Sequence, residues 1–170
     1  MESGKYMNKI LTTKQAIEIA NKLRGAKKTI VLAGGCFDIL HSGHILYLQK
    51  AREQGDILFV FLESDETITR IKGKERPIHT QKDRAKILAS VASVDFIIPL
   101  PRFRDSLLYD QLILSLRPHI IAATKGDPNR FHKERQARSV DGKVVDVLNH
   151  IPNQSTSKFI SDLKKQYEFK

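Results

Sequence analysis

The residue types best suited to chemistry lie in one glycine-rich segment, Gly34-Gly35-Cys36-Phe37-Asp38-Ile39-Leu40-His41-Ser42-Gly43-His44. Gly34 and Gly35 follow an apolar run, where they let the backbone turn sharply and approach a ligand without a Cβ in the way. Gly43 leaves space where a helix is expected to begin. The unpaired N–H groups and positive dipole end of that helix form an anion site, and His41 and His44, three residues apart, can both point toward it. This spacing favours a phosphate group between the two imidazoles.

Three other interpretations of the histidines compete with a phosphate site. Cys36 is near enough in sequence to join them in a transition-metal site, but the remaining candidate residues lack ligand spacing. The imidazoles could instead satisfy local hydrogen bonds at a helix start, which is the more common role of an arbitrary His. A dinucleotide-binding or P-loop segment is the third interpretation, and it fails because neither G-x-G-x-x-G nor a following Lys-Ser/Thr is present in the sequence.

A second group of candidate residues is basic. Lys72, Lys74 and Arg76 lie in a glycine-containing segment after the second expected strand, and Asp83-Arg84 opens the next expected helix. Fixed positive charge beside developing negative charge is what the transfer of a phosphate group requires. Isolated lysines more often form a solvated basic loop, so residue type alone leaves their role open.

The remaining candidate site residues carry hydroxyl or carboxylate groups. Ser155-Thr156-Ser157 opens the last expected helix, where the hydroxyls and free N–H groups can cap the helix and bind phosphate together. Asp38 has three candidate roles: it could orient a histidine, fasten its loop through backbone N–H groups, or hold Mg²⁺ through water. Of the three, we favour the orientation of a histidine.

These candidates lie next to short apolar runs that predict strands. The runs are rich in β-branched residues and fall at 29–33, 57–62, 95–98, 120–123 and 144–148. Helical periodicity alternates with them, after a capping box at 12–15 and then at 45–51, 81–91, 106–116, 131–139 and from about 155. Such alternation predicts an α/β, doubly wound fold with a parallel sheet, whose ligands bind beyond the carboxyl ends of the strands.

Composition sets the class of protein. The 170 residues, 41% hydrophobic and 28% charged, fit one folded domain, which we expect at 9–170 after a flexible leader at 1–8. No apolar run approaches the roughly 20 residues of a membrane span. The 29 basic and 19 acidic residues give a net charge of +10, which favours an anionic partner. The single Cys36 and an N-terminus without a signal-peptide pattern favour the cytoplasm.

The pattern Gly35-x-Phe37-Asp38-x-x-His41-x-Gly43-His44 resembles the signature of the cytidylyltransferase-like nucleotidyltransferases. Within that superfamily, segments 35–41 and 72–78 and the pair Asp83-Arg84 are similar to the adenylyltransferase module of bacterial ADP-heptose synthase. The likeness extends over about residues 9 to 165. It implies a five-stranded parallel (Rossmann-like) sheet with helices on both faces and a nucleoside triphosphate over the first loop.

The resemblance also implies roles for individual residues. His41, His44, Lys72 and Arg84 would act on the transferring group, with Arg84 touching the triphosphate. Mg²⁺ would be carried by the triphosphate phosphates, apart from the water-mediated contact considered for Asp38. The nucleotide, ATP or CTP, would be bound by Gly35, Cys36, Phe37, Asp38, Gly43, Lys74, Gly126, Asp127, Ser155, Thr156 and Ser157.

The implied reaction is an in-line attack by a phosphate oxygen of a small acceptor on the α-phosphorus of the triphosphate, with release of pyrophosphate. It needs no protein nucleophile, and a phosphate monoester that carries about −1.5 to −2 charges near neutral pH needs no general base. The favoured expectation is adenylyl transfer from ATP to a sugar phosphate such as heptose 1-phosphate. A homodimer could form through the first helix and one sheet edge, as in relatives.

Departures from the family pattern leave other substrates open. Residues 124–128 replace the usual Lys-Gly-Gly-Asp-Tyr, and Asn153-Gln154 stand where the heptose branch has Gly and Arg. Transfer from CTP to glycerol 3-phosphate or another polyol phosphate is one alternative, disfavoured because that branch has Arg at the position of His150. Adenylyl transfer to a flavin or pantetheine phosphate is another. The sequence disfavours a non-catalytic nucleic-acid-binding module with the basic stretch 130–138 as its surface. Phe131 alone supplies an aromatic side chain between the basic residues of that stretch.

Overall fold

The structure is a computed structural model that describes residues 9–103, 105–149, 160–162 and 165–166. The expected leader at 1–8 and the candidates Ser155, Thr156 and Ser157 lie outside the described residues.

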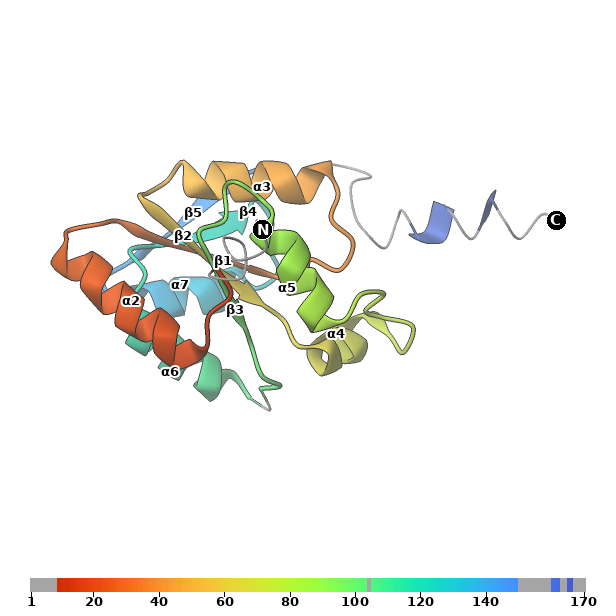
Figure 1. The fold of residues 1–170 in the computed structure, drawn as a ribbon, viewed down its shortest axis with the longest axis horizontal. Coiled ribbons are helices and arrows are strands. Elements are labelled where there is room, and N and C mark those ends of the chain that lie inside the picture. The colour runs from red at the N-terminus through yellow and green to blue at the C-terminus, as the bar shows by residue number, and fades with distance from the viewer. Residues whose placement is uncertain (1–8, 104, 150–159, 163–164, 167–170) are drawn as a thin grey trace, which may run out of the picture.

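A twisted parallel sheet forms the centre of the molecule (Figure 1). In the described part of the chain it has five strands in the order β3-β2-β1-β4-β5. The strands are β1 (Ile30–Gly35), β2 (Ile57–Leu62), β3 (Phe96–Pro99), β4 (Ile120–Thr124) and β5 (Lys143–Leu148). Because β1 pairs with β2 on one side and β4 on the other, the strand order reverses at β1. A ligand site is therefore expected beyond the carboxyl end of β1.

Helices cover both faces of the sheet, as a doubly wound fold requires (Figure 1). They are α2 (Thr13–Gly25), α3 (Ser42–Arg52), α4 (Asp65–Lys72), α5 (Gln81–Ala89), α6 (Ser106–Leu116) and α7 (Arg130–Arg138). Successive strand residues face opposite ways, so Val31 and Ala33 pack with α3 and α5, whereas Ile30 and Leu32 pack with α2, α6 and α7. The predicted fold class, sheet and two-sided cover are confirmed.

Most predicted elements are found within one or two residues of their expected ends. The capping box is present, since the Thr12 hydroxyl accepts from the Gln15 N–H and the Gln15 side chain accepts from the Thr12 N–H. The α4 helix was not predicted, because its eight residues contain two apolar positions, Ile68 and Ile71, which are too few to establish a periodicity. Lys72 therefore ends a helix instead of lying in a loop.

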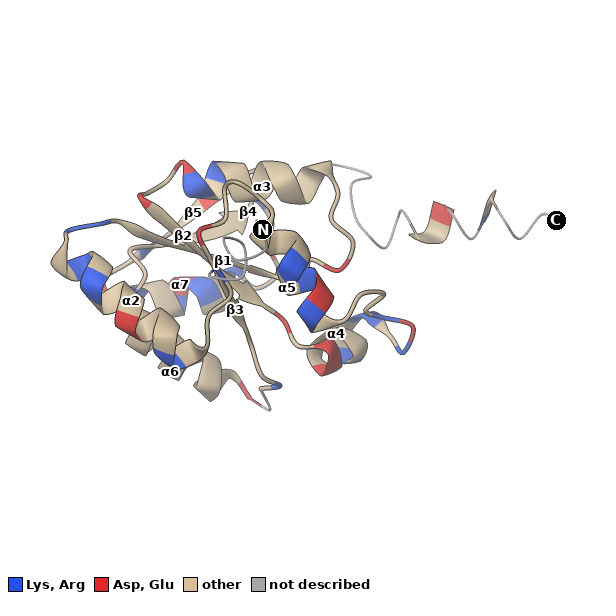
Figure 2. Ribbon diagram, viewed as in Figure 1, with Lys and Arg blue, Asp and Glu red and all other residues tan. Residues whose placement is uncertain are grey.

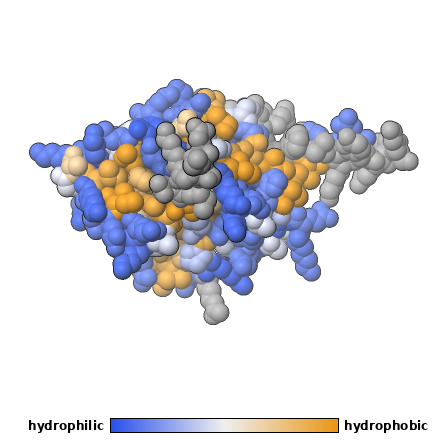
Figure 3. Space-filling model, in the orientation of Figure 1, coloured by the Kyte–Doolittle hydropathy of each residue, from blue (hydrophilic) through white to orange (hydrophobic). Residues whose placement is uncertain are grey.

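One face of the molecule carries both hydrophilic and hydrophobic residues. Figure 3 shows hydrophilic residues over much of one face, with hydrophobic residues between them. Among the described helices, none combines the length and the apolar character needed to cross a bilayer.

Candidate active site

The first candidate loop connects the carboxyl end of β1 to the start of α3. Phe37 is buried in it, with a positive φ of 44°. A Cβ on Gly35 would lie 3.0 Å from Cε2 of the Phe37 ring, closer than ordinary packing allows. Gly35 therefore lets the Phe37 ring fold back under the loop. The ring in turn contacts His44 edge-on, with centroids 5.3 Å apart.

His41 and His44 lie together at the N-terminus of α3. Their rings stack, with centroids 3.8 Å apart and an angle of 26° between the planes. His41 occupies the N-cap position without a side-chain cap hydrogen bond, and Ser42 is the first residue of α3. The Nδ1 atoms of both histidines are buried and have no hydrogen-bond partner among the described residues. Buried polar atoms are normally paired, so the two rings keep hydrogen-bonding capacity that a ligand can meet.

Burial also determines the charge of the two imidazoles. Burial, followed by repulsion from His41, lowers the pKa of His44 to about 4, although a hydrogen bond with the Ile39 carbonyl opposes the change. Burial likewise lowers the pKa of His41. A neutral imidazole presents one N–H donor and one acceptor nitrogen, which suits hydrogen bonding to a phosphate oxygen. The described residues provide no cluster of three His, Cys, Asp or Glu side chains for a metal ion, so Cys36 does not complete such a set with the histidines.

Asp38 fastens one loop to another. Its carboxylate accepts hydrogen bonds from the N–H groups of Ile78 (2.8 Å) and His79 (3.0 Å) and from Nε of Arg76 (2.6 Å). The Asp38 side chain is 1% exposed and that of Arg76 10% exposed. Burial opposes ionisation, but the two N–H groups and the guanidinium outweigh it and lower the pKa of Asp38. The expectation that Asp38 orients a histidine is therefore wrong, because its partners in the described residues all belong to 76–79.

Replacing Asp38 with Asn should lower the free energy of unfolding by about 2–4 kcal/mol at neutral pH, because the Arg76 charge loses its buried partner. The Asp38 pKa is lower in the folded state, so its stabilisation is present above about pH 4 and is lost as the pH falls through the folded value. Urea unfolding should show the gap between the two proteins closing toward about pH 2. The control Glu53→Gln, in an exposed ion pair, should change stability by less than about 0.5 kcal/mol.

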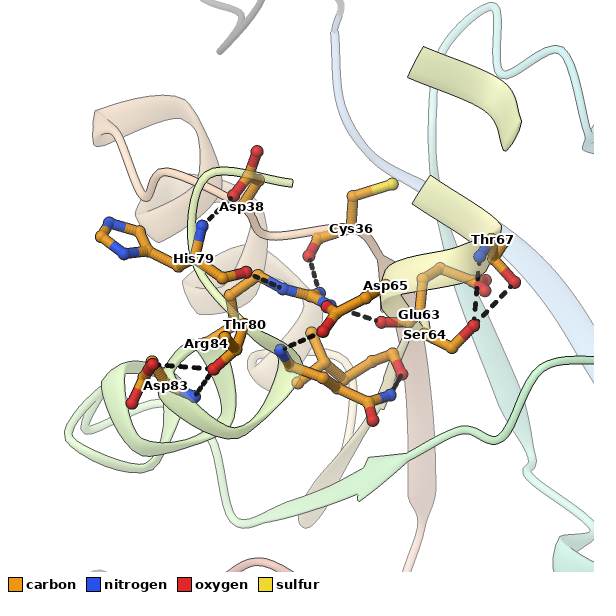
Figure 4. Close-up of polar contacts among 12 residues, drawn as sticks. Cys36, Asp38, Glu63, Ser64, Asp65, Thr67, His79, Thr80, Asp83 and Arg84 are labelled. Carbon is orange, nitrogen blue, oxygen red and sulfur yellow. Dashed lines mark hydrogen bonds and ion pairs between the residues drawn. The ribbon is translucent and has the colours of Figure 1, made fainter. Parts of the chain in front are cut away.

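Arg84 joins three segments behind the histidine loop (Figure 4). Its side chain is fully buried, and its nitrogens donate to the carbonyls of His79 (3.1 Å), Cys36 (2.5 Å) and Glu63 (2.8 Å) and to the Asp65 carboxylate (2.7 Å). These residues belong to the loops after β1 and β2 and to the approach to α5. The protein itself thus engages four of the five Arg84 N–H groups, and the contact with the triphosphate that the resemblance implied stays a prediction.

The basic residues after α4 line a shallow pocket. Its described lining comprises Lys72, Gly73, Lys74, Glu75, Arg76 and Ile160. Lys72 and Lys74 are exposed, whereas Arg76 is held by Asp38. Gly73 has a φ of 99°, which turns the chain at the end of α4, and the Thr69 hydroxyl closes the turn by donating to the Arg76 carbonyl at 2.7 Å. Lys72, at the end of α4, and Lys74, in the loop that follows, are therefore displayed next to the segment that Asp38 ties to the histidine loop.

A second loop approaches α3 from the carboxyl end of β4. Gly126 has a φ of 81° in this loop. Asp127 pairs with Lys133 of α7 at 2.7 Å, and both side chains are largely buried. Lys133 also donates to the Ala122 carbonyl, which accepts from the Tyr47 hydroxyl of α3 as well. Asp127 thus shapes the loop from within while the loop lies beside the histidine-bearing helix.

The chain matches a known protein family over most of its length. A model of the cytidylyltransferase-like family matches residues 32–161, which include both loops and all five strands except the first two residues of β1. The chain belongs to the cytidylyltransferase-like family. It is a nucleotidyltransferase, and the resemblance that the motif indicated is confirmed.

Curated relatives of this cytidylyltransferase-like chain carry the name bifunctional protein HldE. The one from Helicobacter hepaticus is 37% identical over 158 residues, which are 93% of this chain and 31% of the relative. The one from Campylobacter curvus is 37% identical over 166 residues, 95% of this chain and 32% of the relative. The chain therefore spans about a third of the length of these relatives.

Two solved structures share the fold of this chain. A lipopolysaccharide core biosynthesis protein from Thermoplasma volcanium has a TM-score of 0.58 at 24% identity, over 73% of this chain and 97% of that one. A pantoate-beta-alanine ligase from Francisella tularensis, complexed with beta-gamma ATP and beta-alanine, has a TM-score of 0.53 at 17% identity, over 94% and 77% of the two chains. At these identities the similarity concerns the fold alone.

The basic helix α7 of this cytidylyltransferase-like domain is largely neutralised. Figure 2 shows Lys and Arg distributed over α2, α5 and α7 alike. On α7 the cations are paired with carboxylates, in Arg130–Glu134, Arg130–Asp146, Lys133–Asp127, Arg135–Asp110 and Arg138–Glu134. Because binding to nucleic acid depends on cations free to replace counterions, these pairs remove much of the support for a nucleic-acid-binding surface.

Several residues at the site were not predicted. Glu63 and Asp65 directly follow β2, and Tyr109 lies on α6. The rule that ligands gather beyond the carboxyl ends of parallel strands could have indicated Glu63 and Asp65. Tyr109 carries no local signal, since a Tyr within an amphipathic helix is usually part of the core.

Proposed function

We propose that the protein transfers the adenylyl group of ATP to a sugar phosphate such as heptose 1-phosphate and releases pyrophosphate. The observation that supports this most strongly is the stacked pair His41 and His44, whose buried Nδ1 atoms have no partner in the described residues. The pair lies at a helix N-terminus beside the reversal of strand order, where phosphate is best stabilised. The HldE name of the relatives supports a heptose acceptor and hence ATP.

The chemistry requires charge stabilisation more than proton transfer. An acceptor phosphate oxygen forms a bond to the α-phosphorus, the bond from that phosphorus to the bridging oxygen breaks, and pyrophosphate leaves with the electron pair. Negative charge develops on the phosphate oxygens during the transfer, where the imidazole N–H groups and the N-terminus of α3 can stabilise it. Lys72, at the end of α4, and Lys74, in the loop after it, add positively charged side chains. Mg²⁺ would enter with ATP as part of the substrate, because the Asp38 oxygens already accept hydrogen bonds from 76–79.

The setting of the reaction follows from the same reasoning. Residues 9–170 would form one nucleotidyltransferase domain, and the hydroxyls of Ser155, Thr156 and Ser157 would bind the phosphates. The loop that contains Gly126 would contact the nucleoside. We expect the reaction in the cytoplasm, and two such domains would pair as a homodimer.

The test is pyrophosphate release, measured with ATP, CTP, GTP and UTP against heptose 1-phosphate, glycerol 3-phosphate, riboflavin 5′-phosphate and 4′-phosphopantetheine in the presence of Mg²⁺. ATP with heptose 1-phosphate should give the highest kcat/KM, and the product should contain AMP joined to the sugar phosphate. Preference for CTP and glycerol 3-phosphate would replace the proposal with polyol cytidylyl transfer. Absence of pyrophosphate with every pair would refute nucleotidyl transfer to these acceptors.

A further inference from the structure

A polar cluster beside β2 has no role in the phosphate chemistry described above. Glu63 is the first residue after β2, and its N–H donates to the Gly35 carbonyl at 3.2 Å, which sets it next to the start of the histidine loop. The Tyr109 hydroxyl of α6 donates to the Glu63 carboxylate. The Phe103 ring packs edge-on against Tyr109, with centroids 4.8 Å apart. Segments that follow β1, β2 and β3 thus meet at one place.

The Glu63 side chain is half-buried, and its carboxylate can accept more hydrogen bonds than the described residues donate to it. Among the described residues, Tyr109 is the one hydrogen-bond donor to the carboxylate, since Arg84 binds the Glu63 backbone carbonyl instead. Burial raises the pKa of Glu63, although the Tyr109 hydrogen bond and the charges of Arg84 and Arg70 oppose the change. A carboxylate offers about four lone-pair directions, so one donor leaves capacity for further hydrogen bonds. Burying a carboxylate is costly unless hydrogen bonds compensate, so a further donor would stabilise its charged form.

The position of the cluster divides the site into two halves. The loop with Gly126 lies on the β4 side of the histidines, where the proposed function places the nucleoside. Glu63 and Tyr109 lie on the β2–β3 side, and Glu63 and Cys36 follow adjacent strands in Figure 4. An oxygen that attacks the α-phosphorus in line must approach from the side opposite to the leaving pyrophosphate. Because the nucleoside takes the β4 side, the β2–β3 half of the site remains for the body of the acceptor. This step rests on the proposed function.

We propose that Glu63, oriented by Tyr109, accepts hydrogen bonds from the hydroxyl groups of the acceptor and so selects a polyhydroxylated acceptor without a carboxylate. An anionic oxygen pairs well with hydroxyl donors, and aromatic rings such as those of Tyr109 and Phe103 favour contact with the C–H groups of a sugar through their faces. The same negative charge repels an acceptor that carries its own carboxylate, which adds discrimination by repulsion.

The first experiment measures binding of heptose 1-phosphate to the protein saturated with a non-hydrolysable ATP analogue, by isothermal titration calorimetry. Glu63→Gln keeps the shape but removes the charge, and it should weaken acceptor binding about tenfold while the affinity for the ATP analogue changes less than about twofold. Tyr109→Phe should have a smaller effect in the same direction. The exposed Glu53→Gln serves as the matched control and should change neither affinity.

A second arm tests the repulsion. Mannose 1-phosphate and mannuronic acid 1-phosphate differ by one carboxylate, and the wild-type protein should bind the first about tenfold more tightly, whereas Glu63→Gln should bind both within about threefold. The inference would be overturned if Glu63→Gln kept the wild-type affinity for heptose 1-phosphate, or if it lost affinity for the ATP analogue to the same extent. It would also be overturned if the wild-type protein did not bind heptose 1-phosphate. Glu63-dependent acceptor binding without pyrophosphate release would instead leave the inference standing and refute the proposed function.

Discussion

Replacing His44 with Ala should lower turnover at least about 100-fold and leave the fold intact. The imidazole of His44 stacks on His41 and is the more deeply buried of the pair, yet its Nδ1 has no partner in the described residues. The Nδ1 of His44 contributes no hydrogen bond to the described fold, so removal of the ring should act mainly on the reaction, with a smaller loss of stability from the contacts with His41 and Phe37. The measurement is kcat for pyrophosphate release, together with circular dichroism and thermal unfolding of the variant.

The control for this prediction is His132→Ala, on the exposed side of α7, which should retain wild-type turnover. Full activity of the His44→Ala protein would contradict the assigned role, and so would a loss of activity that is accompanied by unfolding. His44→Asn, which keeps a donor of similar size, should recover part of the lost rate.

The pH dependence of stability gives an independent check on His44. Its pKa falls to about 4 in the folded protein, below the usual value of about 6.5, because burial disfavours the charged ring. As the pH drops from about 6.5 toward 4, the unfolded chain therefore takes up a proton that the folded chain does not, and stability is lost over that range. The His44→Ala protein should lose less stability over the same interval in urea unfolding experiments.

Replacing Arg84 with Met should lower the free energy of unfolding by about 3–5 kcal/mol. The fully buried guanidinium satisfies three backbone carbonyls and the Asp65 carboxylate, and each of the carbonyls would be left without that donor. The loops after β1 and β2 would also lose their shared anchor, so turnover should fall together with stability. The measurement is equilibrium unfolding in urea, compared with Lys86→Met, whose exposed side chain lies on the same helix.

Arg84→Lys separates a positioning role from direct contact with phosphate. A lysine keeps the charge, but its single ammonium cannot reach the carbonyls of His79, Cys36 and Glu63 together. If Arg84 acts by holding the loops, Arg84→Lys should be destabilised nearly as much as Arg84→Met. A stable Arg84→Lys protein with weakened ATP binding would show instead that the guanidinium group itself contacts the triphosphate.

The parts of this protein that depend on local sequence could be predicted. β2 was predicted with its observed ends, and the α2 capping box formed as expected, because an apolar run and a Thr-x-x-Gln cap act within a few residues. The histidine loop was also recognisable, since the glycines and histidines that shape it are adjacent in the chain. The α4 helix escaped prediction because its two apolar positions, Ile68 and Ile71, are too few to establish a periodicity.

Tertiary structure decided which side chains meet. Asp38 pairs with Arg76, 38 residues away, and Arg84 reaches Cys36, 48 residues away, because the parallel sheet brings successive loops to one edge. Tyr109 meets Glu63 for the same reason, across 46 residues. The sequence by itself determined the strands, the alternation with helices and the position of the histidine loop between β1 and α3. Whether a charged residue faces ligand or holds another loop depended on burial and on partners distant in sequence, which no local pattern encodes.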